Sequence, residues 1–169
     1  MPVNDDALTA ALIEVEHHVA RSGWDQPARL FALVRTADLI AAEPGLAEHL
    51  GHGPSDGYTS IEQEEFSAGA DLGATLAGIA WPPAVHGCAL ALERTFVPPE
   101  VEAELPDDPQ QAALVVAEHP RRLDLRVVVG VTREGGQHGV ARIRGDEQDL
   151  LGGDDLVPAL TLALSRTFD

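Results

Sequence analysis

The 169-residue chain contains no lysine, one cysteine and few aromatic side chains. Because Cys88 is the single cysteine, no disulfide bond can form within the chain. Aromatic residues make up 4% of the sequence and hydrophobic residues 44%, so the core must consist mainly of Leu, Val, Ala and Ile. This length suits one domain that buries about two-thirds of the surface of its unfolded chain. We therefore predict a single domain over residues 1–169.

Segments for membrane insertion or export are also missing. No stretch approaches the roughly 18 apolar residues that a membrane-spanning helix needs, and the first residues lack the basic and apolar regions of a signal peptide. The 28 acidic residues outnumber the 11 basic ones, which gives a formal net charge of −17. Such a balance argues against binding to nucleic acids or anionic membranes. The sequence predicts a soluble cytoplasmic protein that binds neither.

The motifs that would indicate catalysis are incomplete. Residues 53–57 match the G-x-S-x-G nucleophile elbow, but they are expected to follow a helix, whereas the elbow requires a preceding strand. His86 and Cys88 share one face of an expected strand, yet no Cys-x-x-Cys pair completes a metal site. No glycine-rich phosphate-binding loop is present. We predict no catalytic residue, no metal and no cofactor.

Apolar periodicity predicts the helices. Leu8, Leu12, Val15 and Val19 recur at spacings of four, three and four, which indicates a helix that ends near Gly23. The polar residues of this helix, Glu16 among them, are expected mostly off its apolar stripe. Further helices are predicted after Thr36 as the cap, over about 45–50 and 72–79, from Asp108 as the cap to Pro120, and from about 155.

The strands are predicted from alternation and bounded apolar runs. The run Arg29–Arg35 fits either a helix or a buried strand, and we interpret it as a strand. Residues 58–66 are expected to form an exposed edge strand and residues 85–97 a long strand, whereas 98–107 form an acidic connector. The chain is thus predicted to be α+β, with an approximately five-stranded, mostly antiparallel sheet. Its helices pack chiefly on one face, and a C-terminal β-hairpin precedes the last helix.

Positive charge is concentrated in one segment. Every basic residue is arginine, and six of the eleven lie between positions 121 and 144. That segment contains two acids and carries a charge of +4, whereas the rest of the chain carries −21. Arginines grouped in an acidic chain either neutralise the protein's own carboxylates or bind an anionic partner.

The arginines belong to the predicted hairpin. A three-residue turn, Glu134-Gly135-Gly136, would join apolar faces and set Val129 opposite Ala141. It would also set Arg126 opposite Arg144, where like charges are unfavourable unless an anion lies between them. The polar face would then carry the candidate binding residues, which are Arg122, Arg126, Arg142, Arg144 and His138.

Two interpretations of this face remain open. Solvation, or pairing with carboxylates such as those of Asp146 and Glu147, is the ordinary explanation for a charged sheet face. The functional hypothesis is a non-enzymatic protein-interaction module, adaptor-like or chaperone-like, that uses this face or an exposed strand edge. Its expected partner is a second copy of the chain or an acidic protein. The alternative is a small-molecule anion-binding protein or enzyme, with His138 as its acid–base group.

Several short segments carry a family resemblance. They are Gly23-Trp24-Asp25-Gln26-Pro27, Arg29 to Val34, Gly78-Ile79-Ala80-Trp81-Pro82, Gly87-Cys88-Ala89-Leu90 and Asp155-Leu156-Val157-Pro158. The chain resembles a group of small uncharacterised proteins from high-GC Gram-positive bacteria. This resemblance implies a bacterial cytoplasmic origin and assigns no activity, cofactor or catalytic residue. The element order is also similar to secretion-chaperone-like α+β folds, as an analogy of fold alone.

Overall fold

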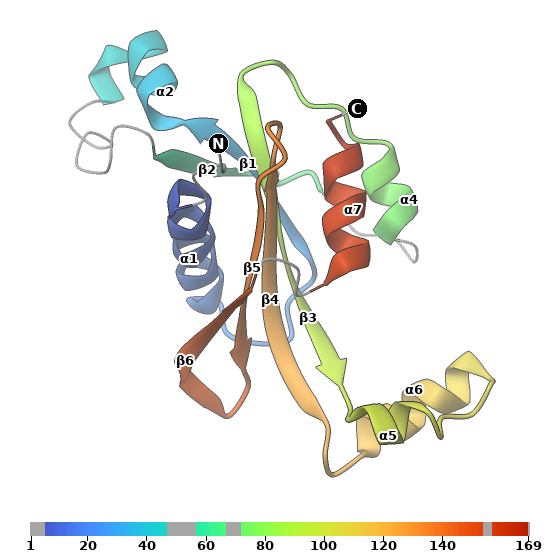
Figure 1. Cartoon of the computed structure of the whole chain (residues 1–169). Helices are drawn as coiled ribbons and strands as arrows, with labels where there is room; N and C mark the ends of the chain where they lie inside the picture. Colours follow the sequence, from blue (N-terminus) through green and yellow to red (C-terminus); the bar gives the residue numbers. More distant parts are fainter. Residues whose placement is uncertain (1–5, 47–56, 67–71, 154–156, 169) are drawn as a thin grey trace.

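One antiparallel sheet organises the molecule (Figure 1). The computed structural model describes residues 6–46, 57–66, 72–153 and 157–168. Six strands lie in the order β2-β1-β3-β4-β5-β6. Their bounds are β1 Arg29–Arg35, β2 Tyr58–Glu62, β3 Val85–Phe96, β4 Leu123–Thr132, β5 Gln137–Ile143 and β6 Asp146–Gly153. The central strands β1, β3 and β4 are rich in apolar residues because both faces of the sheet are covered where they run.

Helix α1 (Asp6–Ala20) covers one face of the sheet, and α4 (Leu72–Ala77) and α7 (Pro158–Arg166) cover the other (Figure 1). The apolar stripe of α1 packs on Phe31, Leu33 and Val128. On the opposite face, Leu160 and Leu164 of α7 join a second buried cluster with Leu90 and Val129. The sheet is therefore the middle layer of three.

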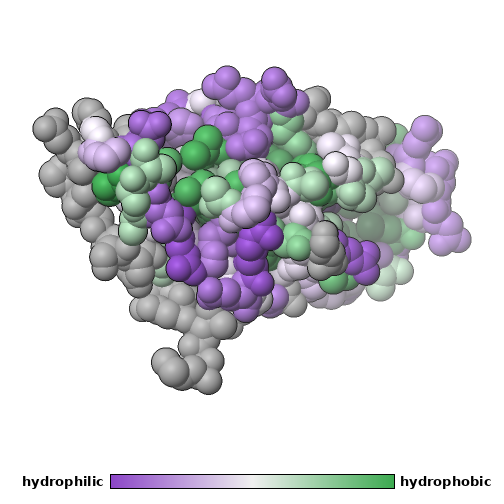
Figure 2. Space-filling view, turned by 90° about the horizontal axis from the view of Figure 1, so that it is seen from above, coloured by the Kyte–Doolittle hydropathy of each residue, from purple (hydrophilic) through white to green (hydrophobic). Residues whose placement is uncertain are grey.

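The remaining helices lie at the two ends of the sheet. Helix α2 (Thr36–Ala42) and the 3₁₀ turn η1 (Pro44–Leu46) follow β1. Helices α5 (Pro99–Glu102) and α6 (Pro109–Glu118) connect β3 to β4 and project from the far end of these strands (Figure 1). On the end of the molecule seen from above, hydrophobic residues lie among hydrophilic ones (Figure 2).

The α+β class and the antiparallel sheet predicted from the sequence are confirmed. Residues 29–35 form a strand, β2 is an edge strand, and the Asp108 side chain caps α6 by accepting a hydrogen bond from the backbone of Gln110 at 3.1 Å. The sheet has six strands rather than about five, since the polar and glycine-containing segment of β6 becomes a strand by pairing with β5. The helices cover both faces, and not chiefly one.

Two local predictions were wrong. Thr36 is the first residue of α2 instead of its cap, and its hydroxyl lies 2.9 Å from that of Thr59. In the hairpin, the amide of Thr132 donates to the carbonyl of Gly136 at 2.9 Å, and Gly135 takes the positive φ of 91°. The turn therefore begins one residue earlier than predicted.

This turn shifts the register of the hairpin by two residues. Val129 lies opposite Gly139, and Arg126 lies opposite Arg142 rather than Arg144. A shift of two residues leaves every side chain on its predicted face because side chains alternate with period two.

Candidate functional site

Two of the predicted binding arginines, the buried Arg126 and the partly buried Arg142, pack against a carboxylate of α1. Glu16 has no exposed surface and accepts hydrogen bonds from Arg142 Nε at 2.5 Å and from Arg126 Nη1 at 3.4 Å. Arg126 is 2% exposed, and the Arg142 side chain is 13% exposed. One carboxylate therefore lies between the two guanidinium groups that face each other across β4 and β5. Helix α1 shields this pairing from water, which makes the loss of either partner costly.

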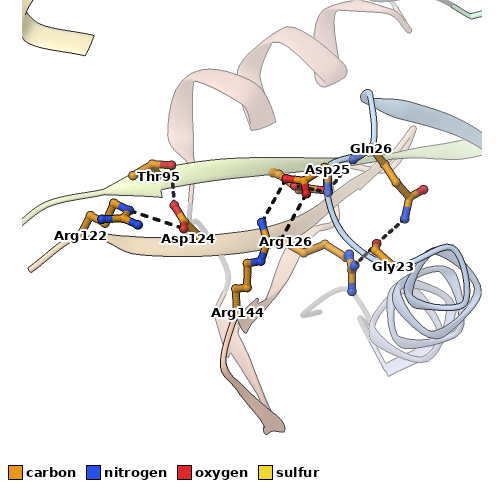
Figure 3. Close-up of polar contacts among 9 residues, drawn as sticks. Gly23, Asp25, Gln26, Thr95, Arg122, Asp124, Arg126 and Arg144 are labelled. Atoms are coloured by element: carbon orange, nitrogen blue, oxygen red, sulfur yellow. Dashed lines mark hydrogen bonds and ion pairs between the residues drawn. The ribbon is translucent and has the colours of Figure 1, made fainter. Parts of the chain in front are cut away.

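The loop after α1 closes over the same face (Figure 3). Arg126 donates from Nη2 to the carbonyl of Gly23 at 2.6 Å, and its guanidinium lies 4.4 Å from the centre of the Trp24 ring. Asp25 accepts from Arg144 at 3.0 and 3.3 Å. The backbone amides of Asp25 and Gln26 both donate to the Glu93 carboxylate at 2.9 Å, which holds Asp25 at its positive φ of 64°.

The other predicted residues lie apart from this cluster. Arg122 is near Asp124, with Nε and Oδ2 3.7 Å apart, at the far end of β4. His138 lies on β5 opposite Gly130. The face predicted from the sequence thus exists, but its arginines pair with the chain's own carboxylates, which supports the first of the two interpretations.

Sequence reasoning missed the role of Glu16. The residue was expected mostly off the apolar stripe of α1, yet it follows Leu12 by four residues and therefore lies on the buried face of the helix. This spacing was the available signal. An acidic residue at a buried helical position indicates a cationic partner inside the fold.

An open pocket of 370 Å³ lies beside the buried cluster. Its lining includes Glu16, His17, Trp24 and the two arginines that pair with Glu16. Among the described residues, Nε of Arg126 is a buried side-chain donor without a hydrogen-bond partner. A buried donor without a partner destabilises a protein by about 1–3 kcal/mol. A bound ligand that supplied a hydrogen-bond acceptor to Nε would remove this cost.

A larger groove of 760 Å³ lies between α1 and the edge strand β2. Its lining includes His18 of α1, Arg21 just after this helix, and Ser60, Ile61 and Glu62 of β2. Glu62, one of the lining residues, accepts hydrogen bonds from Arg29 Nη2 at 2.6 Å and from Arg29 Nε at 2.7 Å. This ion pair lowers the pKa of Glu62 below its ordinary value, so the carboxylate stays charged.

The remaining candidates for chemistry lack the required arrangement. Burial raises the pKa of the Cys88 thiol to about 12, which leaves it protonated and a poor nucleophile. The pKa of His86 is lowered, mainly by burial and secondly by the positive charge of Arg35. Residues 53–56 of the G-x-S-x-G match lie outside the described residues. Within the described parts of the chain, no group of three or more His, Cys, Asp or Glu residues is placed to hold a metal.

These features define an α+β protein with one covered sheet, a buried ionic cluster and an open groove at a strand edge. Among the helices that the structure describes, none combines the length and apolar character needed to cross a membrane. The chain belongs to the PPA1309-like protein family, whose model matches residues 8–169. The predicted resemblance to small uncharacterised proteins of high-GC Gram-positive bacteria is thereby confirmed. Comparisons with curated proteins and with solved structures found no match.

Proposed function

We propose that this protein is a non-enzymatic interaction module that binds an extended segment of a partner protein at the edge of β2. An interaction function and an exposed strand edge were both expected from the sequence. The proposed contact is at this edge and not at the arginines, which pair with carboxylates of the chain itself. We place the module in the cytoplasm, a reducing compartment with which the free thiol of Cys88 is compatible.

The backbone of β2 carries the proposal. Gln63 donates from its amide to the carbonyl of Leu30 at 2.8 Å, and the amide of Thr36 donates to Gly57 at 2.9 Å. The odd-numbered residues of β2 therefore direct their backbone groups toward β1. By the alternation of an antiparallel pair, the backbone groups of Ser60 and Glu62 point away from β1, toward the side with no further strand in the described sheet.

The groove beside this edge makes room for the added strand. An extended peptide that pairs with Ser60 and Glu62 would lie along the 760 Å³ groove, next to α1. In this mode of binding, hydrogen bonds between the two main chains supply the affinity. The groove contacts every second side chain of the peptide, which gives specificity.

We expect that Ser60→Pro weakens peptide binding by at least about tenfold, because it removes an outward N–H without removing a hydrogen bond to β1. The ligand is the tightest-binding member of a phage-displayed library of random linear peptides selected on the wild-type protein. Its affinity is measured by fluorescence anisotropy.

Ser60→Ala is the matched control and should bind as the wild type does, since it keeps the backbone donor. Two copies of the peptide, each methylated on one of the two alternate sets of backbone nitrogens, should differ: one should lose binding to the wild type and the other should keep it. Equal binding of the peptide to the proline and alanine variants would refute the proposal, as would a library that yields no binder.

A second candidate function, the binding of a small carboxylate or phosphate, is favoured by the open pocket beside Arg126. The unsatisfied Nε of this residue is suited to an anionic acceptor, and the Trp24 ring lies beside the same guanidinium. His17 lines the pocket and is exposed, so replacing it leaves the core unchanged.

If this second function holds, His17→Asp should bind inorganic phosphate and acetate several-fold more weakly than His17→Asn by isothermal titration calorimetry. The two variants have similar shapes and differ by one negative charge at the pocket. Equal titrations, or no binding of either anion to the wild type, would remove this candidate.

A further inference from the structure

The connection between β3 and β4 forms an arm at the far end of the sheet, away from α1, α4 and α7 (Figure 1). We define the arm as α5, α6 and the ends of the two strands that carry them, residues 96–123. Helix α6 has ten residues, and none of its side chains is buried. An isolated helix of that length is marginal in water, because helix stability in proteins comes mostly from packing.

The arm concentrates the exposed apolar surface of the protein. Four of the seven large hydrophobic residues that are exposed among the described residues lie on it: Phe96 at 40%, Leu114 at 63%, Val115 at 41% and Leu123 at 49%. Phe96 and Leu123 are direct cross-strand partners at the ends of β3 and β4. Grouped apolar residues of this kind mark surfaces that bind a partner.

The charge of the arm indicates the chemistry of that partner. The arm contains six acidic residues and two arginines, Arg121 and Arg122, so its net charge is −4. Glu100 pairs with Arg121 at 2.9 Å, on side chains that are more than half exposed. The other five acidic residues outnumber the remaining arginine, Arg122, so the arm keeps a net negative charge. A second copy of the chain would bring a further net charge of −17 toward them.

We propose that the arm binds an amphipathic helix of another protein, one with an apolar face for Leu114 and Val115 and a basic polar face for the surrounding carboxylates. This mode places an apolar helix face against an apolar surface and sets orientation by charge. The surface is separate from the edge of β2, so the inference does not depend on the function proposed above.

The test uses two fluorescein-labelled synthetic helices with the same leucine face, one with lysines and one with glutamates on the polar face. Fluorescence anisotropy should show that the full-length wild type binds the lysine peptide, more weakly at higher salt, and does not bind the glutamate peptide. Leu114→Asp should weaken binding of the lysine peptide by at least about tenfold. Leu123→Asp, in a different element of the arm, should weaken it as well.

Leu162→Asp is the matched control, since Leu162 is an exposed leucine on α7, 53% exposed, and should bind as the wild type does. The added aspartates separate the proposal from simple charge attraction, which would strengthen binding to a cationic peptide. Unchanged or tighter binding by Leu114→Asp would overturn the proposal, and so would no binding of the lysine peptide to the wild type. A wild-type dimer in sedimentation velocity that Leu114→Asp converts to a monomer would assign the arm to a second copy instead.

Discussion

Glu16→Ala is expected to lower the free energy of unfolding by about 3–5 kcal/mol, the usual effect of removing one partner from a buried ion pair. The substitution leaves Arg126 and Arg142 facing each other across the sheet without the carboxylate between them. It also opens a cavity under α1. Urea denaturation followed by circular dichroism measures the change.

Glu14→Ala is the control for helix composition and total charge. Glu14 is an exposed residue of the same helix, and its replacement should change the free energy of unfolding by no more than about 0.5 kcal/mol. If Glu16→Ala is as stable as Glu14→Ala, the buried cluster does not hold α1 on the sheet.

Gly87→Ala is expected to destabilise the protein by about 1–3 kcal/mol, toward the upper end of the range for overpacking. A Cβ atom at this position would lie 2.6 Å from the backbone carbonyl oxygen of Val131. Because that oxygen belongs to β4, it moves away only if the β3–β4 pairing opens. The free energy of unfolding in urea is again the measurement.

Two other glycines provide a graded comparison. A Cβ at Gly130 would lie 2.6 Å from the Cδ2 atom of Leu12, which is the end of a flexible side chain and shifts more easily than a carbonyl. At Gly152, on the edge strand β6, the nearest atom is 3.5 Å away, at ordinary contact distance. Destabilisation should therefore decrease from Gly87→Ala through Gly130→Ala to Gly152→Ala. The reverse order would contradict the packing described for β3 and β4.

The structure changes how the arginines relate to function. Had they formed an open cationic face, an acidic partner would have been the natural ligand. Arg126 and Arg142 are instead placed under α1, and Arg144 and Arg122 lie at ion-pair distance from Asp25 and Asp124. The surfaces that project outward are a strand edge and an acidic, apolar arm. The proposed partners are accordingly an extended peptide and a basic helix.

Local patterns in the sequence were sufficient for much of the fold. The apolar spacing of α1, the alternation along β4 and the cap at Asp108 each depend on residues close in the chain. The face on which each arginine lies was predictable for the same reason, because period two assigns faces even when the register is wrong. Strand β6 was missed because its sequence has little strand propensity and its structure depends on pairing with β5.

The sequence by itself determined the class of fold, the helix that covers the arginines and the face on which those arginines lie. Tertiary structure alone decided what the arginines contact. Glu16 and Arg126 are 110 positions apart, and no local rule connects them. They meet because α1 packs across β4 and β5. Burial of a charged group is costly unless a group of opposite charge is paired with it, so the Glu16 carboxylate and the arginines stabilise one another there.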